Sequence, residues 1–90
     1  MPQRVVPIVN RLGMHARAAA KFVGLASQYE ADVFVSRKGR EVNGKSIMGV
    51  MMLAAAQGTE VVIRSEGAAD ADDALNALSS LIANRFGEDA

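Results

Sequence analysis

His15 is the only histidine in the 90-residue chain, and it lies in the stretch NRLGMHARAAAKFVG at residues 10–24. It directly precedes an alanine-rich run with helical spacing, and Arg17 follows two residues later. The first turn of a helix leaves several backbone N–H groups unpaired and carries a partial positive charge, so it attracts anions. An imidazole at this position can attack a phosphoryl group and hold it as a phosphoramidate. The helix end and the Arg17 guanidinium would then stabilise the added charge.

Two other interpretations of His15 stay open at this level. A single histidine before a helix is more often an exposed cap or a satisfied polar contact than a nucleophile. An acid–base enzyme is disfavoured because the loop at residues 10–15 contains no carboxylate, and the sequence positions no second titratable group beside the ring. The missing carboxylate also argues against a hydrolytic triad, and it favours reversible storage of phosphate over hydrolysis.

Ser46 is the second candidate, in the stretch NGKSIMGVMM at residues 43–52. It is expected to be the N-cap of a short helix, and a serine at that position is usually nothing more. A phosphate there would nevertheless meet free N–H donors and the favourable end of the helix dipole. Val50 and Leu53 are expected to pack inward. The helix would then expose an adaptable apolar patch formed by Ile47, Met48 and Met51.

The composition argues against several classes of site. The chain has no cysteine and a single histidine, so thiol chemistry is excluded and neither a metal nor another cofactor is expected. Three Phe, one Tyr and no Trp offer little for base stacking, and the net charge is zero, so nucleic acid is not an expected partner. Nothing resembles a signal peptide or a membrane-spanning run, which predicts a soluble cytoplasmic protein without membrane insertion. Residues 1–45 carry eight of the ten basic side chains, which predicts a basic side.

Hydrophobic periodicity predicts the order β-α-β-β-α-β-α, with the helices covering one face of a sheet. Pro7 cannot donate to a neighbouring strand, so the first strand should lie at a sheet edge. Asp70 is expected to cap the last helix, which Phe86 continues and Gly87 ends. The predicted strands are residues 3–9, 32–36, 41–43 and 60–65, and the first two helices span 16 to about 28 and 46–55.

The motifs GMHARAAAKFV, NGKSIMGVMMLAA and QGTEVVI resemble the HPr family. Its members are the histidine-containing phosphocarriers of the bacterial phosphoenolpyruvate-dependent sugar phosphotransferase system. The resemblance runs from about residue 3 to residue 86 and rests on two motifs at the expected separation. It implies an α+β fold, an open-faced β-sandwich in which a four-stranded antiparallel sheet of order 1-4-2-3 carries three helices on one face. Residues 1–90 would form a single HPr-like domain.

The resemblance also implies specific roles. Enzyme I, charged from phosphoenolpyruvate, would phosphorylate His15 on Nδ1, and EIIA domains would receive the phosphoryl group. Arg17 would stabilise the phosphate, and the backbone N–H of Ala16 would donate to it. Ser46 matches the serine that HPr kinase/phosphorylase modifies. The docking surface for partners would comprise Ala16, Ala20, Ile47, Met48 and Met51.

One position departs from the family pattern, because Ala18 stands where proline usually follows the arginine. Alanine keeps good helix propensity and adds an N–H donor, so we expect the helix to begin normally. The run KSIMGVMMLAA is more similar to the kinase-regulated branch of the family. Two alternatives stay open: a nitrogen-related phosphotransferase paralogue, and a regulatory binding module that acts through Ser46 and the methionine patch.

Overall fold

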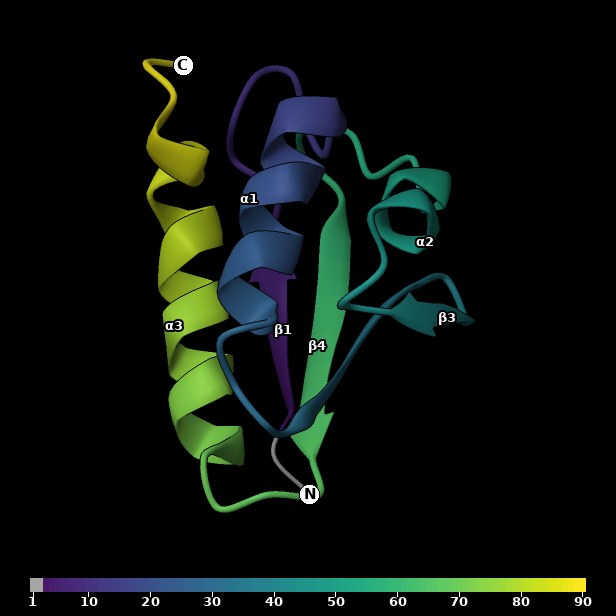
Figure 1. Ribbon diagram of the computed structural model, residues 1–90. Coiled ribbons are helices and arrows are strands. Elements are labelled where there is room, and N and C mark those ends of the chain that lie inside the picture. The colour runs from purple at the N-terminus through teal and green to yellow at the C-terminus, as the bar shows by residue number, and fades with distance from the viewer. Residues whose placement is uncertain (1–2) are drawn as a thin grey trace.

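Four antiparallel strands form one sheet in the order β1-β4-β2-β3, which confirms the predicted topology (Figure 1). The computed structural model describes residues 3–90. The strands are β1 (Gln3–Pro7), β2 (Asp32–Arg37), β3 (Arg40–Asn43) and β4 (Glu60–Glu66). The helices are α1 (Ala16–Ala26), α2 (Ile47–Met52) and α3 (Ala71–Ala83), followed by the short 3₁₀ turn η1 (Arg85–Gly87).

Alternation of side chains along the strands gives the sheet one buried face. In the central strand β4, Val61, Ile63 and Ser65 are buried while the residues between them are not. Val6 on β1 lies opposite Val61, and Val35 on β2 lies opposite Ile63. Because β1 pairs only with β4, Pro7 lies on an edge strand, as predicted.

The three helices lie on this buried face, with α1 and α3 side by side and α2 next to the first turns of α1 (Figure 1). Their apolar stripes and the sheet enclose one hydrophobic core, whose largest fully buried side chains include Phe22, Leu78, Ile82 and Phe86. The core therefore fixes the start of α1, where His15 lies, against the sheet and the other two helices.

Three predicted elements are too long. The first strand ends at Pro7 rather than residue 9, although Ile8 N–H still donates to the Thr59 carbonyl at 2.8 Å. The first helix ends at Ala26, and α2 ends at Met52. The short length of α2 has a local cause, because Ala54 adopts a left-handed backbone with φ of 50° and turns the chain toward β4.

The last helix begins where it was predicted to begin, whereas its predicted end is wrong. Asp70 occupies the N-cap position of α3, but its side chain makes no capping hydrogen bond, because its carboxylate accepts backbone N–H groups of Glu30 and Ala31 at 2.8 and 3.0 Å. The helix ends at Ala83 instead of continuing through Phe86, since Arg85 and Phe86 have φ of 58° and 54°. The left-handed turn still delivers the Phe86 ring to the core, where it is fully buried.

Candidate functional site

His15 occupies the N-cap position of α1, as the sequence predicted, and its backbone is extended. The preceding loop is held in place by Met14, whose side chain is buried and whose N–H donates to the Ala55 carbonyl at 2.9 Å. The His15 ring makes no capping hydrogen bond to the helix, and its side chain is 27% exposed. The imidazole therefore lies at the N-terminus of α1 and is partly exposed to solvent.

The first turn of α1 offers backbone donors beside this ring. The first intrahelical bond runs from Ala19 N–H to the His15 carbonyl at 2.8 Å, so the N–H groups of Ala16, Arg17 and Ala18 precede the helical ladder. The helix begins normally although position 18 is alanine, and Ala18 is fully buried. An anion bound at this end would meet unpaired N–H groups and the positive end of the helix dipole.

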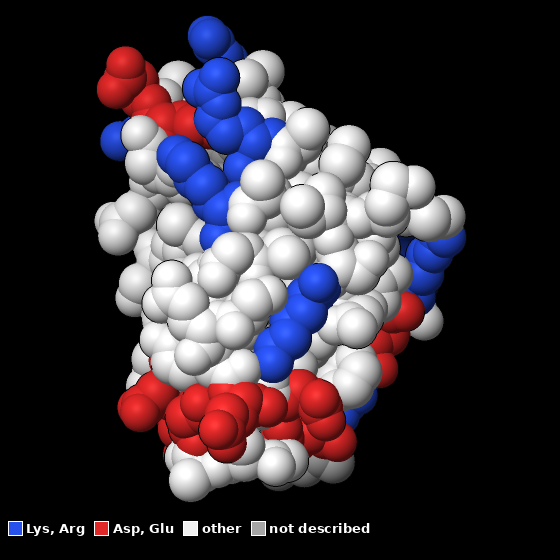
Figure 2. Space-filling view, viewed as in Figure 1, with Lys and Arg blue, Asp and Glu red and all other residues white. Residues whose placement is uncertain are grey.

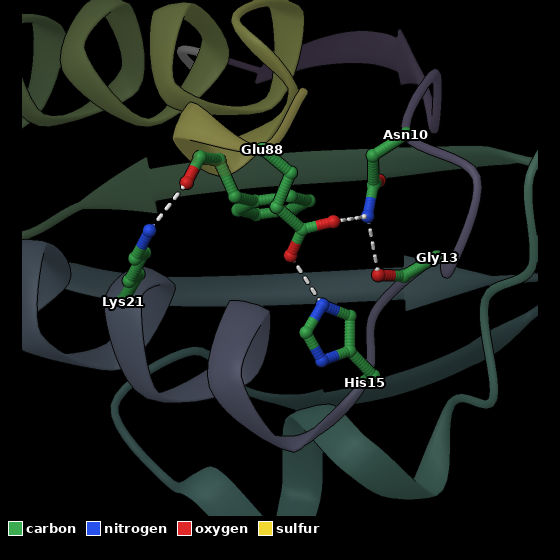
Figure 3. Close-up of polar contacts among 6 residues, drawn as sticks. Asn10, Gly13, His15, Lys21 and Glu88 are labelled. Carbon is green, nitrogen blue, oxygen red and sulfur yellow. Dashed lines mark hydrogen bonds and ion pairs between the residues drawn. The ribbon is translucent and has the colours of Figure 1, made fainter. Parts of the chain in front are cut away.

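A carboxylate lies against the His15 ring, which the sequence did not predict. Glu88, 73 residues away, places Oε2 in contact with His15 Nε2, while its Oε1 accepts a hydrogen bond from Asn10 Nδ2 at 3.0 Å (Figure 3). The expectation that no second titratable group is positioned beside the ring is therefore wrong. The cause is spatial: the loop itself has no acid, but the segment after α3 returns to it.

These contacts stabilise the ionised form of the Glu88 carboxylate. The hydrogen bond from Asn10, together with the one from the His15 ring, holds the pKa of the Glu88 carboxyl below its ordinary value. Lys21 adds a weaker favourable charge, and partial burial of the carboxylate opposes these effects. Since Glu88 is ionised near neutral pH, it accepts hydrogen bonds and donates none.

The His15 ring opens into a hollow of about 410 Å³. Arg17 lines the same hollow, so the structure brings both predicted residues together, and Arg11 adds a second guanidinium. The remaining lining residues are Leu12, Glu88, Asp89 and Ala90. Guanidinium groups are suited to binding phosphate, so the hollow has the donors for a group attached to the ring.

Comparison with known proteins identifies the family. The family model described as the PTS HPr component phosphorylation site matches residues 2–84. The chain belongs to the HPr family of phosphocarriers of the phosphotransferase system.

Relatives and a solved structure agree with this assignment. The phosphocarrier protein HPr of Cupriavidus necator is 53% identical over 88 residues, and that of Pseudomonas aeruginosa is 55% identical over 89 residues; in both comparisons 98% of each chain is covered. The crystal structure of HPr-C-His from Thermoanaerobacter tengcongensis superposes with a TM-score of 0.94 at 41% identity, covering all of both chains. All three proteins match this chain over nearly its full length, and the solved structure also matches it in fold.

The second motif of this HPr-family chain, NGKS, builds the start of α2. The Asn43 side chain accepts Lys45 N–H at 2.8 Å, and Lys45 Nζ donates to the Tyr29 carbonyl at 2.7 Å. Gly44 lies so close to β2 that a Cβ there would be 2.6 Å from Val33 Cγ1. Ser46 then caps the helix as predicted, with its Oγ accepting Gly49 N–H at 3.1 Å. Ser46 lies outside the lining of the His15 hollow.

The predicted apolar patch is exposed. Val50 and Leu53 point inward and are buried, whereas Met48 is 74% exposed. The neighbouring helix α1 exposes Ala16 and Ala20. Together with Ile47 and Met51, which are also exposed, these residues form the surface predicted for docking. The sequence reasoning missed Leu12 and Met52, both more than half exposed; the uninterrupted Ile-Met-Gly-Val-Met-Met run was the available signal for Met52.

Among residues 3–90, no group of three or more His, Asp and Glu side chains is placed to hold a metal ion. No helix described over the same residues has the length and apolar character to cross a membrane.

Proposed function

We propose that His15 is the phosphoryl acceptor of this phosphocarrier, receiving the group on Nδ1 from enzyme I and passing it to EIIA domains. The observation that carries the proposal is the placement of the ring. Its Nε2 is engaged by Glu88, which leaves Nδ1 as the nitrogen with a free lone pair, at the open mouth of α1. In this role the chain is a substrate of other enzymes and has no turnover of its own.

The groups around the ring suit reversible transfer. The guanidinium of Arg17 lines the same hollow as His15 and would neutralise charge on the phosphoryl oxygens. The N–H of Ala16, at the first position of α1, would donate to the same oxygens. These donors are already in place before the phosphoryl group arrives, so little reorganisation is needed.

We further propose that phosphorylation of Ser46 by HPr kinase/phosphorylase regulates this transfer. Ser46 is half-buried at the start of α2, directly before the exposed Ile47 and Met48. A phosphate there would put two negative charges beside apolar side chains that must lose water on docking. Enzyme I and EIIA domains would dock on Ala16, Ala20, Ile47, Met48 and Met51.

Residues 1–90 are proposed to act as one HPr-like domain. The family match over residues 2–84 and the single hydrophobic core support this extent. A cytoplasmic location stays a prediction. The protein is likewise predicted to act in the sugar phosphotransferase system rather than in a nitrogen-related one. The alternative function is a purely regulatory binding module in which His15 is not phosphorylated. The following experiment distinguishes it from phosphoryl transfer.

The test is incubation with phosphoenolpyruvate and enzyme I. We expect one phosphate per chain, labile in acid and stable in base, because a phosphoramidate hydrolyses when its nitrogen is protonated. His15→Ala removes the only imidazole and should abolish this labelling.

Ser46→Ala is the matched control, because it removes the other proposed phosphorylation site and leaves the ring intact. It should be labelled like the unsubstituted protein. Full labelling of a folded His15→Ala variant, or a modification stable in acid, would contradict the assignment of His15 as acceptor.

A further inference from the structure

Glu88 determines which nitrogen of the His15 ring carries the proton. Its ionised carboxylate can only accept a hydrogen bond, so the contacting nitrogen, Nε2, must be the donor (Figure 3). In the neutral ring the other nitrogen, Nδ1, then has the lone pair. The contact therefore selects the tautomer in which Nδ1 is the nucleophile.

Glu88 is itself held by a buried side chain. Asn10 is fully buried, and its Nδ2 donates both to Glu88 Oε1 at 3.0 Å and to the Gly13 carbonyl at 2.8 Å (Figure 3). The Glu88 side chain is only 15% exposed. One amide group thus ties the carboxylate to the loop that carries His15.

The backbone before Glu88 is bent to bring it here. Arg85, Phe86 and Gly87 have φ of 58°, 54° and 79°, a left-handed region that is unfavourable for the two non-glycine residues. The bend is held by the buried Phe86 ring and by Lys21 Nζ, which donates to the Phe86 carbonyl at 2.7 Å. Strained backbone persists where the surrounding structure fixes it, and here it aims a carboxylate at the acceptor ring.

We propose that Glu88 is a positioning residue for phosphoryl transfer: it holds the His15 proton on Nε2 and balances the positive charge that the ring acquires when Nδ1 is phosphorylated. This inference rests on the proposed function of His15.

The transfer step is balanced without any further reactant. The Nδ1 lone pair forms the new N–P bond, and the bond between phosphorus and the donor nitrogen of phosphorylated enzyme I breaks, with its electron pair staying on the donor. His15 keeps its Nε2 proton, so the ring becomes a phosphorylated imidazolium. The Glu88 carboxylate faces that proton and compensates the charge, and transfer to the next acceptor returns the ring to its neutral state.

Three cations and one further acid lie around this pair. Arg11 and Arg17 line the hollow and would face the phosphoryl oxygens, and Lys21 adds positive charge near Glu88. Asp89 also lines the hollow, but the carboxylate bonded to the ring is that of Glu88. Asp89 is therefore a matched control for the ring-proton measurement, because it has the same charge and lines the same hollow.

The test combines kinetics with a measurement on the unphosphorylated protein. For the chain as a substrate of enzyme I, Glu88→Ala should lower kcat about tenfold, as expected for the loss of one charge-assisted hydrogen bond. KM should change less than about twofold, because Glu88 contributes no side chain to the proposed docking surface. Glu88→Gln, which keeps an acceptor and loses the charge, should be intermediate. Asp72→Ala, which removes an exposed acid on α3 outside the hollow, should leave both constants within about twofold.

Nitrogen-15 NMR of the His15 ring supplies the independent readout. The unphosphorylated protein should carry its ring proton on Nε2, in slow exchange with solvent, and this protection should be lost in Glu88→Ala and kept in Asp89→Ala. A ring protonated on Nδ1, unchanged protection in Glu88→Ala, or a kcat within twofold of the unsubstituted protein would overturn the role of Glu88. Absence of labelling in the unsubstituted protein would overturn the proposed function instead, and the NMR result would still decide the contact.

Discussion

Gly13 determines the path of the loop that presents His15. Its φ is 67°, and a Cβ built on it would lie 2.5 Å from the Ala55 carbonyl oxygen and 3.0 Å from Ala56 Cα. Both neighbours are backbone atoms of the segment between α2 and β4, so they cannot move aside as a side chain would. Glycine is required here for its left-handed backbone and for the absence of a side chain.

Gly13→Ala is therefore expected to lower the free energy of unfolding by about 3 kcal/mol, combining left-handed strain with a steric clash. It should also slow phosphoryl acceptance, since the displaced loop carries both His15 and the Gly13 carbonyl that Asn10 contacts. Urea unfolding measures the first effect and labelling by enzyme I the second.

Gly39→Ala is the matched control for this substitution. Gly39 has φ of 80° in the β2–β3 turn, and no atom lies within 4 Å of its Cβ position. It should cost only about 1 kcal/mol and leave the labelling rate unchanged. Equal losses in the two variants would show that the close approach to Ala55 has no energetic effect.

Single residues differ in how far the sequence could predict their place. His15 at the N-cap and the exposed Met48 were predictable because each depends on neighbours within one helical turn. Glu88 was not, since its partners Asn10 and His15 are 78 and 73 residues away and no local pattern links them. A contact of this kind depends on how two distant segments end beside each other in the folded chain.

Among the elements, α2 combines a well-defined cap with an unpartnered apolar face. Ser46 caps Gly49 N–H at one end, and the exposed side chains of Met48 and Met51 follow within about one turn. An acidic group at position 46 can still cap the helix, since aspartate is among the preferred N-cap residues. Its charge, however, would lie beside apolar groups that must lose water when a partner docks.

Ser46→Asp should therefore leave the free energy of unfolding within about 1 kcal/mol and slow His15 labelling by about tenfold. Ser80→Asp, which adds the same charge at an exposed position on α3, should leave the labelling rate unchanged. Thermal unfolding and the enzyme I reaction measure the two quantities. Unchanged labelling of Ser46→Asp would remove Ser46 from the regulatory proposal.

Periodicity predicted the order of the elements along the chain and the number of helices, and the family resemblance implied the strand order, whereas several element ends were not predicted. The last helix shows why. Phe86 continues the apolar spacing of α3, so periodicity predicted more helix, yet the ring reaches the core through a left-handed turn. Spacing reports which side chains are buried and does not distinguish the backbone paths that bury them.

At the scale of the whole molecule, charge is distributed unevenly. Figure 2 shows basic side chains gathered toward the upper end, beside a smaller acidic group, and a broad acidic band at the lower end. Glu88 is one of the acidic side chains whose hydrogen bonds depend on the fold, because Asn10 and His15 come from a distant part of the chain. Unfolding the molecule breaks both hydrogen bonds, so the ionisation of Glu88 is coupled to global stability.

The direction of that coupling follows from the pKa of Glu88, which in the folded protein lies below its ordinary value of 4.5. The unfolded chain binds a proton at this carboxyl at a higher pH than the folded chain does. The stabilisation from Glu88 is therefore fully present above about pH 5.5, and it is lost as the pH falls through 4.5 and then through the lower folded value.

We expect the difference in unfolding free energy between the unsubstituted protein and Glu88→Gln to shrink as the pH falls below about 5. Taking this difference cancels the other carboxylates, which titrate in both proteins. Asp89→Asn removes the same charge without the hydrogen bonds to Asn10 and His15, so its difference should change less over the same range. Urea unfolding between about pH 3 and pH 5.5 would check this, and a difference that grew on acidification over that range would contradict the lowered pKa of Glu88 and, with it, the contact that orients the His15 ring.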